Sequence, residues 1–390
     1  MKKAGIFLVI TMIMAGCGGN RKSNNQSEAF ITVDITAGYP KKELILQDFM
    51  DMEYIALETT DDFLCQGIVL AVGRGIILVK NQNNDGNIFV YDRNGKGLRI
   101  INRRGQGGEE YLRISEIALD EANGEMFVND FSLGKIMVYD LFGKFKRSFR
   151  YERGAYGEIY IFDNENLICY DSSFNPSAKT DKSSFFLISK QGGSIVKEIQ
   201  IDIRQKKTPT GLRVESGNIR IDASAYFPII PYSDSWILTE YSSDTIFRFL
   251  PDYSLIPFIG RTPSIQSMNP ELLFYPGIIT NRYLFMKTEM NETGAGNVAR
   301  GVLTKAQLVY DKQEGVISEY TVLNNDYSTR QTVDMAKKTI SKEIAFWQKI
   351  EAYELVDAYK KGEVKGQLKE IAAQLEEESN PVIMLVKYKK

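Results

Sequence analysis

The chain has 390 residues, contains no histidine and carries a formal net charge of −2, from 48 Lys and Arg against 50 Asp and Glu. Without an imidazole it has no Ser-His-Asp triad, no Cys-His pair and no histidine-ligated metal, so those enzyme classes are excluded. The mildly acidic balance gives no electrostatic support for a nucleic-acid partner, whereas carboxylate, tyrosine, lysine and arginine chemistry stays open.

Residues 1–16 predict a lipoprotein signal peptide. Lys2 and Lys3 form a basic start, and the apolar stretch 4–15 is too short for a membrane span, which needs about 20 residues. Small residues precede Cys17, and this pattern predicts cleavage before Cys17 and lipid attachment to its thiol. The alternative is an ordinary secretory signal followed by an incidental cysteine.

Lipid on Cys17 would hold a folded domain at a membrane, because each buried CH₂ group contributes about 0.8 kcal/mol. Residues 17–29 are polar and predict a flexible tether. Gly18 gives no signal for retention in the inner membrane, so we expect an outer-membrane lipoprotein of the cell envelope, with the choice between its periplasmic and outer faces left open. The membrane is therefore the first expected partner.

From residue 30 onward the sequence predicts short strands joined by tight turns. Two apolar, β-branched runs flank Asn94 and Gly95 and predict a hairpin, and the turn at 91–96 recurs 48 residues later at 139–144. A four-stranded unit that repeats every ~40–50 residues is typical of a propeller blade. The first unit is predicted at 67–72, 75–80, 87–91 and 97–101, and the second at 114–119, 125–129, 135–139 and 144–149.

Three more units follow, and the two ends of the chain remain for a sixth. The third is predicted at 159–162, 167–170, 184–189 and 194–201, the fourth at 219–223, 235–239, 245–249 and 255–259, and the fifth at 277–280, 283–287, 306–310 and 316–320. The strands 30–35 and 52–57 and the apolar run 382–388 are expected to form the sixth blade and close the ring. The predicted fold is therefore an all-β, six-bladed propeller over 30–390.

A helical insertion is predicted at 331–379, before the closing strand. Two apolar stripes there have helical spacing, and Gly362 separates them. The first stripe comprises Val333, Ala336, Ile340, Ile344 and Trp347, and the second comprises Val364, Leu368, Ile371 and Leu375. We expect the helices to pack on the ring, and the alternative is a helix pair that docks another envelope protein.

With these features in place, the chain after Cys17 resembles the six-bladed β-propeller lipoproteins of Gram-negative bacteria, which are similar to NHL-repeat propellers. The resemblance rests on the lipid-attachment signal, the repeated hairpins, the loop 105–111 and Asn380-Pro381. The family loop usually reads Gly-x-Gly-Pro-Gly-Glu-Tyr, and here Gly108 and Glu109 replace its Pro and its last Gly. The resemblance implies the fold and the envelope location, and it implies no particular activity.

The loop 103–111 is the first candidate for ligand binding, because glycine-rich backbone can form a nest that binds anions. No helix follows it, which distinguishes it from a phosphate-binding loop. A crossover between two blades is the more ordinary interpretation. The candidate ligand-binding side chains in this loop are Arg103, Arg104, Gln106, Glu109 and Tyr111.

Asn81, Asn83 and Asp85 have the spacing of a calcium loop, and calcium is the one cofactor that the sequence suggests. The first position holds Asn in place of Asp and the closing Glu is missing, so a polar hairpin tip is the competing interpretation. A second candidate lies at 225–232, where the rings of Tyr226 and Tyr232 could stack on a sugar or another flat ligand. Packing beneath a loop between blades is the alternative there.

No pair of carboxylates stands out as an acid and a base, so no catalytic residue is assigned. We therefore expect a lipid-anchored module that binds a small ligand or an envelope protein on the loops or in the channel of the ring. The alternative is a carboxylate- or calcium-dependent hydrolase or lyase with its site at the central channel.

Overall fold

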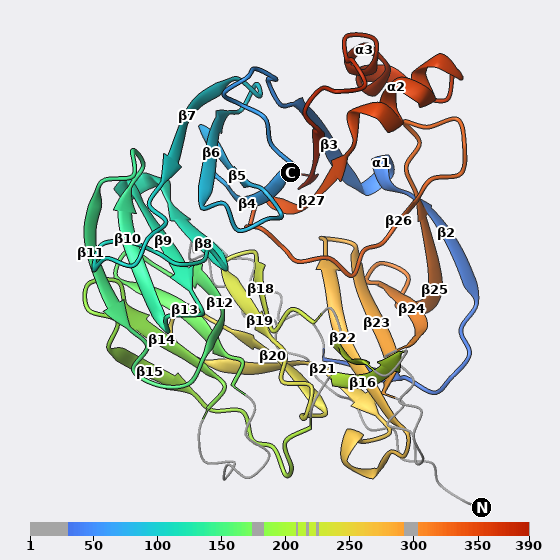
Figure 1. The fold of residues 1–390 in the computed structure, drawn as a ribbon. Helices are drawn as coiled ribbons and strands as arrows, with labels where there is room; N and C mark the ends of the chain where they lie inside the picture. The colour runs from blue at the N-terminus through green and yellow to red at the C-terminus, as the bar shows by residue number, and fades with distance from the viewer. Residues whose placement is uncertain are drawn as a thin grey trace, which may run out of the picture.

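The computed structural model of the protein describes residues 30–173, 183–207, 210–215, 218–223, 226–291 and 303–389. Six sheets are arranged as blades around a central axis (Figure 1). The prediction of an all-β, six-bladed propeller is therefore confirmed. We number the blades I to VI along the chain, beginning at residue 68. The predicted signal peptide and the tether, including Cys17, lie outside the described residues.

Blades I to III each consist of four consecutive antiparallel strands. Blade I contains β4 (Ile68–Val72), β5 (Ile76–Lys80), β6 (Asn87–Asp92) and β7 (Gly97–Asn102). Blade II contains β8 (Glu116–Asp120), β9 (Glu125–Asp130), β10 (Lys135–Asp140) and β11 (Phe145–Arg150), with the 3-10 turn η1 (Glu121–Asn123) after β8. Blade III contains β12 (Tyr156–Ile161), β13 (Asn166–Asp171), β14 (Phe185–Ser189) and β15 (Ile195–Ile199). These bounds follow the first three predicted units closely.

Blades IV and V also have four consecutive strands each. Blade IV contains β18 (Ile229–Tyr232), β19 (Ser235–Leu238), β20 (Thr245–Phe249) and β21 (Leu255–Thr262), and the 3-10 turn η2 (Ile265–Ser267) follows it. Blade V contains β22 (Glu271–Ile279), β23 (Tyr283–Asn291), β24 (Leu303–Asp311) and β25 (Val316–Leu323). The short strand β26 (Thr332–Val333) pairs with β25.

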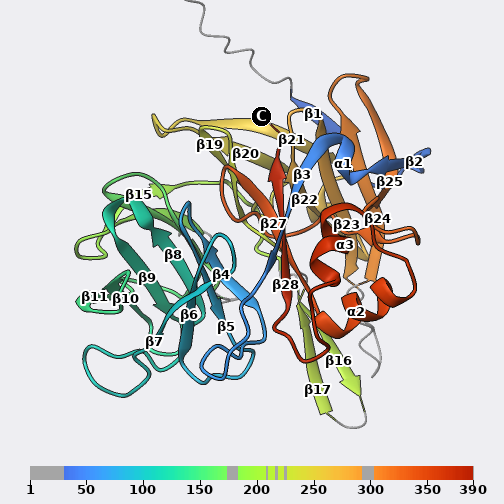
Figure 2. The same ribbon diagram turned by 90° about the horizontal axis from the view of Figure 1, so that it is seen from above.

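The prediction that 219–223 starts the fourth blade is wrong. β16 (Thr210–Glu215) and β17 (Asn218–Ala223) pair with each other as a separate hairpin, which projects from one face of the ring (Figure 2). The inner strand of blade IV is β18, within the segment that the sequence suggested to be an aromatic loop. Pro231 is compatible with this strand because β18 is an edge strand, so its missing N–H removes no ladder bond.

Alternation along each strand builds the core, since successive side chains point to opposite faces of a blade. On β5, Ile77 and Val79 pack against blade VI, whereas Leu78 packs against blade II. The same division recurs around the ring, so that six hydrophobic clusters fill the six contacts between neighbouring blades. The middle strands of a blade, such as β5 and β6, therefore read as nearly continuous apolar runs because both of their faces are buried, whereas outer strands such as β7 and β11 alternate between buried and exposed residues.

The third turn of blades I and II repeats the same chemistry. The Asp92 carboxylate accepts hydrogen bonds from two backbone N–H groups of its turn, at 2.8 and 2.9 Å, and Asp140 does so at the same two distances. The glycines that follow, Gly95 and Gly143, have φ of +86° and +83° and lie directly against the preceding blade. This turn therefore shapes the hairpin and docks it on its neighbour.

The ring closes in blade VI, where β27 (Ile344–Ile350), β28 (Val382–Tyr388) and β3 (Met50–Ala56) form one sheet. β28 lies between the other two strands and pairs with both in antiparallel register. Both ends of the chain therefore contribute to the last blade, as predicted for 52–57 and 382–388.

The prediction that 30–35 belongs to the sixth blade is wrong. β1 (Ile31–Asp34) pairs in parallel with β21 of blade IV, and β2 (Lys41–Ile45) pairs in parallel with β25 of blade V. The side chains of Val33 and Ile35 explain this placement, since they are buried in the cluster between blades IV and V. The first strands thus follow the outer edges of blades IV, V and VI in chain order (Figure 1).

Helices are few among the described residues: α1 (Leu46–Phe49), α2 (Ala352–Lys360) and α3 (Gly366–Ala372). α2 and α3 lie on the outside of blade VI (Figure 2), and Leu355 and Leu368 join the cluster between blades V and VI. The helix predicted over the first stripe is wrong, because 344–350 is β27 and pairs with β28. In the described ranges, no helix has the length and apolar character needed to cross a membrane.

Candidate functional site

A cavity of about 1320 Å³ occupies the centre of the ring. The inner strands β4, β8, β12 and β18 supply its wall on one side. The segment 338–342, which leads from blade V into blade VI, and Trp347 of β27 supply the other side. Because five of the six blades contribute to one wall, the cavity exists only when the ring is closed.

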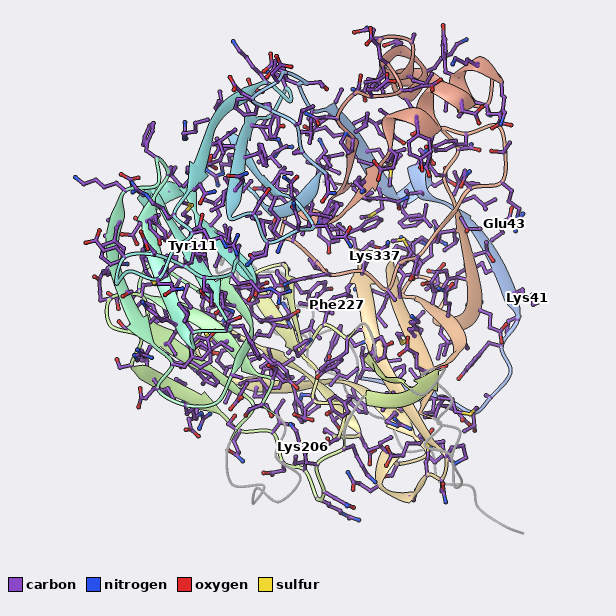
Figure 3. The ribbon with its side chains drawn as sticks, viewed as in Figure 1. Lys41, Glu43, Tyr111, Lys206, Phe227 and Lys337 are labelled. Atoms are coloured by element: carbon purple, nitrogen blue, oxygen red, sulfur yellow. The ribbon has the colours of Figure 1, made fainter. Side chains whose placement is uncertain are left out.

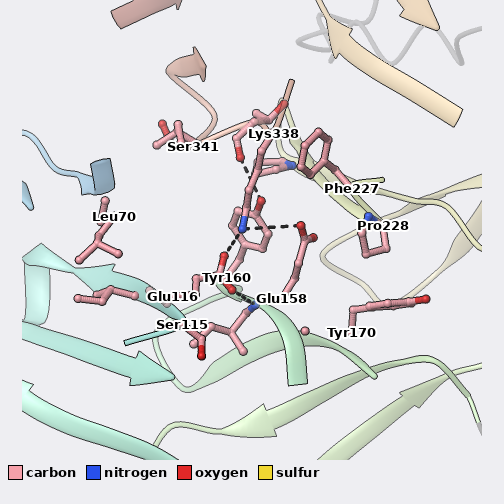
Figure 4. Close-up of a pocket in the computed structure, with 18 of the residues that line it drawn as sticks. Leu70, Ser115, Glu116, Glu158, Tyr160, Tyr170, Phe227, Pro228, Lys338 and Ser341 are labelled. Carbon is pink, nitrogen blue, oxygen red and sulfur yellow. Dashed lines mark hydrogen bonds and ion pairs between the residues drawn. The ribbon is translucent and has the colours of Figure 1, made fainter. Parts of the chain in front are cut away.

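One polar cluster lies inside this cavity (Figure 4). The Lys338 ammonium forms a short ion pair with Glu116 Oε1 and approaches Glu158 Oε1 at 3.7 Å. The same ammonium lies 5.2 Å from the centre of the Tyr160 ring, within the range of a cation–π contact. The cluster thus joins one cation, two carboxylates and one phenol.

Backbone groups of the neighbouring blades hold the carboxylates in place. Glu116 accepts a hydrogen bond from the Ile159 N–H at 3.0 Å, and Glu158 accepts one from the Ile229 N–H at 3.3 Å. Tyr160 donates to the Thr339 carbonyl at 3.1 Å. Each group therefore links its own blade to another element, which fixes the cluster at the junction of blades II, III and IV with the segment 338–342.

Burial changes the protonation of this cluster. Burial raises the pKa of Glu158 to about 7, against the opposing effect of the Lys338 charge. Burial alone would lower the pKa of Lys338, but the adjacent Glu116 and Glu158 hold it well above its ordinary value. Lys338 is therefore a fixed cation, and Glu158 is the group that can exchange a proton near neutral pH.

Aromatic rings form much of the remaining wall. Tyr226 packs edge-on against Tyr241 with ring centres 5.1 Å apart, and burial raises the pKa of Tyr226 well above its ordinary value. Trp236 and Trp347, the two tryptophans of the chain, both line the cavity. At one side Lys206 pairs with Glu240 at 2.6 Å. Flat apolar surfaces with a few placed polar groups are the usual composition of a small-molecule site.

The loop 103–111 lies elsewhere, in the crossover from blade I to blade II, and none of its residues belongs to the cavity wall. Tyr111 is fully buried, and its hydroxyl donates to the Gly86 carbonyl at 2.7 Å. Arg103 Nε donates to the Gly143 carbonyl at 2.8 Å, and the Glu109 carbonyl accepts from the Tyr139 hydroxyl at 2.7 Å. Figure 3 shows Tyr111 within the body of the blades, away from Phe227 near the centre. Ligand binding by Arg103, Arg104, Gln106, Glu109 or Tyr111 stays a prediction.

The two tyrosines predicted from 225–232 separate in the structure. Tyr226 lines the cavity, as a ligand-binding role requires. Tyr232 is not part of the cavity wall, and its hydroxyl accepts a hydrogen bond from Lys312 Nζ at 2.9 Å. Of the side chains singled out from the sequence, Tyr226 lies in the cavity wall, and ligand binding by Tyr226 and Tyr232 stays a prediction.

The calcium candidate is a hairpin tip whose oxygens already have donors. Asn81 donates to the Asp85 carboxylate at 2.6 Å and accepts from the Gln66 N–H at 2.8 Å. The second Asp85 oxygen accepts from the Asn87 N–H at 2.9 Å. Among the described residues, no group of three or more Asp, Glu or Cys side chains is placed to hold a metal ion. Calcium binding by Asn81, Asn83 and Asp85 stays a prediction.

Sequence reasoning missed Glu116, Glu158 and Lys338. The available signal was a glutamate in the inner strand of each of two successive units, where the neighbouring residues are apolar. A charge at such a position has no solvent to face and therefore indicates a buried polar partner. Lys338 could not be assigned as that partner, because it lies in the segment predicted to be helical.

The closed ring and its cavity can now be compared with known proteins. A family model described as a 6-bladed beta-propeller matches residues 20–346. The chain belongs to this family, DUF5128. No functionally curated protein matches this DUF5128 chain in sequence.

Three solved structures are similar to this chain at low sequence identity, and one of them has a TM-score above 0.5. A Bacteroides fragilis protein assigned as exported has a TM-score of 0.59 and 15% identity, covering 93% of this chain and 100% of its own. A Bacteroides vulgatus member of the DUF4221 family has a TM-score of 0.40 and 10% identity, covering 88% and 100%. Virginiamycin B lyase of Staphylococcus aureus has a TM-score of 0.36 and 11% identity, covering 87% and 100%. At these identities the comparisons concern the fold alone.

Proposed function

We propose that this DUF5128 chain is a lipid-anchored propeller of the cell envelope that binds an organic molecule in its central cavity. The observation that carries the proposal is the cavity of about 1320 Å³, which exceeds the ~300–1,000 Å³ common for small-molecule sites and is therefore large enough to enclose such a ligand. The aromatic wall and the Lys338 cluster supply the apolar surface and the few polar groups that such a site needs. The signal sequence that ends at Cys17 supports the location.

A concave site favours a small molecule over a protein partner. A protein that docks on a propeller uses its exposed loops, whereas the aromatic rings here line the interior. Tyr170 and Trp236 are both largely buried, so a flat protein surface could not reach them. The ligand must therefore be small enough to enter the ring.

The test is to narrow the cavity and measure binding of N-phenyl-1-naphthylamine, a neutral apolar probe whose fluorescence can be excited through tryptophan. Ser115 and Ser173 are exposed wall residues: Ser115 directly precedes β8 of blade II, and Ser173 follows β13 within blade III. The double variant Ser115→Phe/Ser173→Phe should bind the probe at least tenfold more weakly than the wild type. Ser328→Phe, at an exposed serine outside the wall, should bind as the wild type does. Binding of the probe with equal affinity by all three proteins would overturn the proposal, and so would a wild type that binds neither this probe nor its sulfonate analogue, 8-anilinonaphthalene-1-sulfonate.

A second candidate is a hydrolase or lyase that uses the carboxylates of the cavity. The observation that favours it is the pKa of Glu158, which burial raises to about 7 and which suits a general acid or base. A panel of p-nitrophenyl esters and glycosides should then show turnover that is optimal near pH 7 and is lost in Glu158→Gln. Turnover no faster in the wild type than in that variant would exclude this candidate. Its calcium-dependent form predicts a higher melting temperature with calcium chloride, reversed by a chelator.

A further inference from the structure

The cavity wall carries more lysines than carboxylates, and this difference indicates the chemical class of the proposed ligand. Among the residues that the structure describes, the lysines and carboxylates of the wall are four lysines and two glutamates: Lys80, Lys206, Lys338, Lys342, Glu116 and Glu158. Lys206 is neutralised by Glu240, and Lys338 by Glu116 with Glu158. Two lysines are left without a carboxylate at ion-pair distance among the described residues, Lys80 and Lys342.

Lys80 is the more buried of these two cations. Its ammonium donates to the Ile114 carbonyl at 2.8 Å. The next residue along the chain, Ser115, is exposed, and its hydroxyl accepts a hydrogen bond from the Phe131 N–H at 3.3 Å. Burial lowers the pKa of Lys80, the positive charge of Arg113 lowers it further, and Asp85 opposes the shift. Lys80 is therefore a half-buried cation at the wall with no carboxylate at ion-pair distance among the described residues, which leaves a position for an anion beside its ammonium.

Lys342 adds a second positive charge beside the aromatic wall. Its ammonium lies 5.7 Å from the centre of the Trp236 ring, and burial lowers its pKa against the weak opposing charge of Asp234. A cationic ligand has no such opening in the described part of the wall, because the two carboxylates found there, Glu116 and Glu158, already face Lys338. The unbalanced charge of the cavity is therefore positive.

On this basis, and resting on the proposed function, we propose that the cavity selects organic acids: molecules with an apolar or aromatic body and one anionic group, which Lys80 and Ser115 bind. The body lies along the aromatic wall, where a ring can stack on the tyrosines and tryptophans. The anionic group accepts hydrogen bonds from the Lys80 ammonium, and these compensate for the hydration that the ammonium loses on burial. The class includes carboxylates, sulfonates and phosphates that share this shape.

The experiment uses a matched pair of probes. 8-Anilinonaphthalene-1-sulfonate and N-phenyl-1-naphthylamine have the same ring system, and only the first carries an anionic group. Because both tryptophans of the chain line the cavity, energy transfer from tryptophan to the probe reports occupancy of this site. The wild type should bind one equivalent of the sulfonate at least tenfold more tightly than the neutral probe.

Lys80→Met keeps the apolar stem and removes the charge. In this variant the ratio of the affinity for the sulfonate to the affinity for the neutral probe should fall toward one. The affinity for the neutral probe should be unchanged, which also shows that the variant is folded. Lys96→Met, at an exposed turn lysine outside the wall, should keep the wild-type preference. A wild type that prefers the neutral probe, or a preference that survives Lys80→Met, would overturn the inference while leaving the proposed function intact. Failure of both probes to bind would overturn the proposed function itself.

Discussion

Glu158 is an acid in a site where the charged form is poorly solvated, so its protonation is coupled to the stability of the ring. Its backbone donor, Ile229, belongs to the next blade, and its cation, Lys338, comes from the far side of the cavity. Proton release from Glu158 therefore acts on the contacts that hold three parts of the ring together.

This coupling predicts a pH-dependent contribution to stability. Burial raises the pKa of Glu158 from its ordinary 4.5 to about 7, so between these values the folded state holds a proton that the unfolded state has lost. The contribution of Glu158 is fully present below pH 4.5 and is lost as the pH rises toward 7. The unfolding free energy of the wild type minus that of Glu158→Gln should fall by about 3 kcal/mol over this range, measured by urea unfolding. A difference that is constant with pH would contradict the assignment.

At the scale of single residues, the sequence could identify candidate types but could not place them together. Glu116 and Glu158 lie on adjacent blades, whereas Lys338 follows Glu158 by 180 residues. Spacing along a chain carries no information about distance across a ring. Tyr226 was singled out because aromatic residues beside prolines mark a junction between elements, and it lies in the cavity wall, whereas Arg103 and Tyr111 form hydrogen bonds within and between blades I and II.

At the scale of elements, the turn between the third and fourth strands of a blade is constrained by its close contact with the preceding blade. The turn glycines Gly95, Gly143 and Gly193 have positive φ, and at each a Cβ would collide with the preceding blade. At Gly95 the obstacle is the Ala56 carbonyl oxygen, 2.0 Å from the position of a Cβ. Backbone cannot move away as a flexible side chain can, so this position requires both the conformation and the small size of glycine.

The cost of the steric contact at Gly95 can be separated from the cost of placing a non-glycine residue at positive φ by comparison with a second glycine. Gly315 also has positive φ, but a Cβ there meets nothing within 4 Å. We expect Gly315→Ala to cost about 1 kcal/mol from backbone strain alone, and Gly95→Ala about 3 kcal/mol or more, because it also forces blades I and VI apart. Chemical unfolding of the two variants compares these costs. Equal destabilisation would show that the approach of Gly95 to Ala56 is unimportant.

The strands of blades I to III were predictable because they obey local rules: β-branched runs, turns with Asp and Gly, and a regular repeat. The errors arose where distant pairing decides the structure. Residues 344–350 carry apolar side chains three and four apart, yet they form a strand because β28 offers a partner for their backbone. Residues 30–35 read correctly as a strand, but their partner, β21, lies more than 200 residues away.

The whole ring depends on its last blade, so loss of β28 should be far more damaging than loss of β1. β28 pairs on both edges, and its residues 382–386 are all buried. A chain that ends at Pro381 should show no cooperative thermal unfolding and should aggregate through exposed strand edges. A chain that begins at Lys41 lacks β1 but keeps every strand of blade VI, and it should still melt cooperatively at a lower temperature. Cooperative melting of both truncated chains would exclude closure of the ring by β28.

The proposed anchor makes a separate prediction for the whole molecule. In cells, the wild type should incorporate a labelled fatty acid and sediment with the membranes, and Cys17→Ser should lose both properties while the ring stays folded. Cys65→Ser is the matched control, because Cys65 lies within the ring and should not affect lipid attachment. Incorporation of the label into Cys17→Ser would rule out this cysteine as the lipid site.

The path of the first strands has a mechanical consequence. A pulling force on the chain before residue 31 reaches β1 first, then β2, and reaches β3 only after both have detached. β1 and β2 are additions to blades that already have four strands, so their release leaves the circle of six sheets unbroken. Once detached, residues 31–49 could span about 60 Å in total, at up to ~3.3–3.6 Å per residue, before any load falls on the closing sheet. The segment 31–49 can therefore detach and extend under tension while the six blades, and the cavity between them, keep their arrangement.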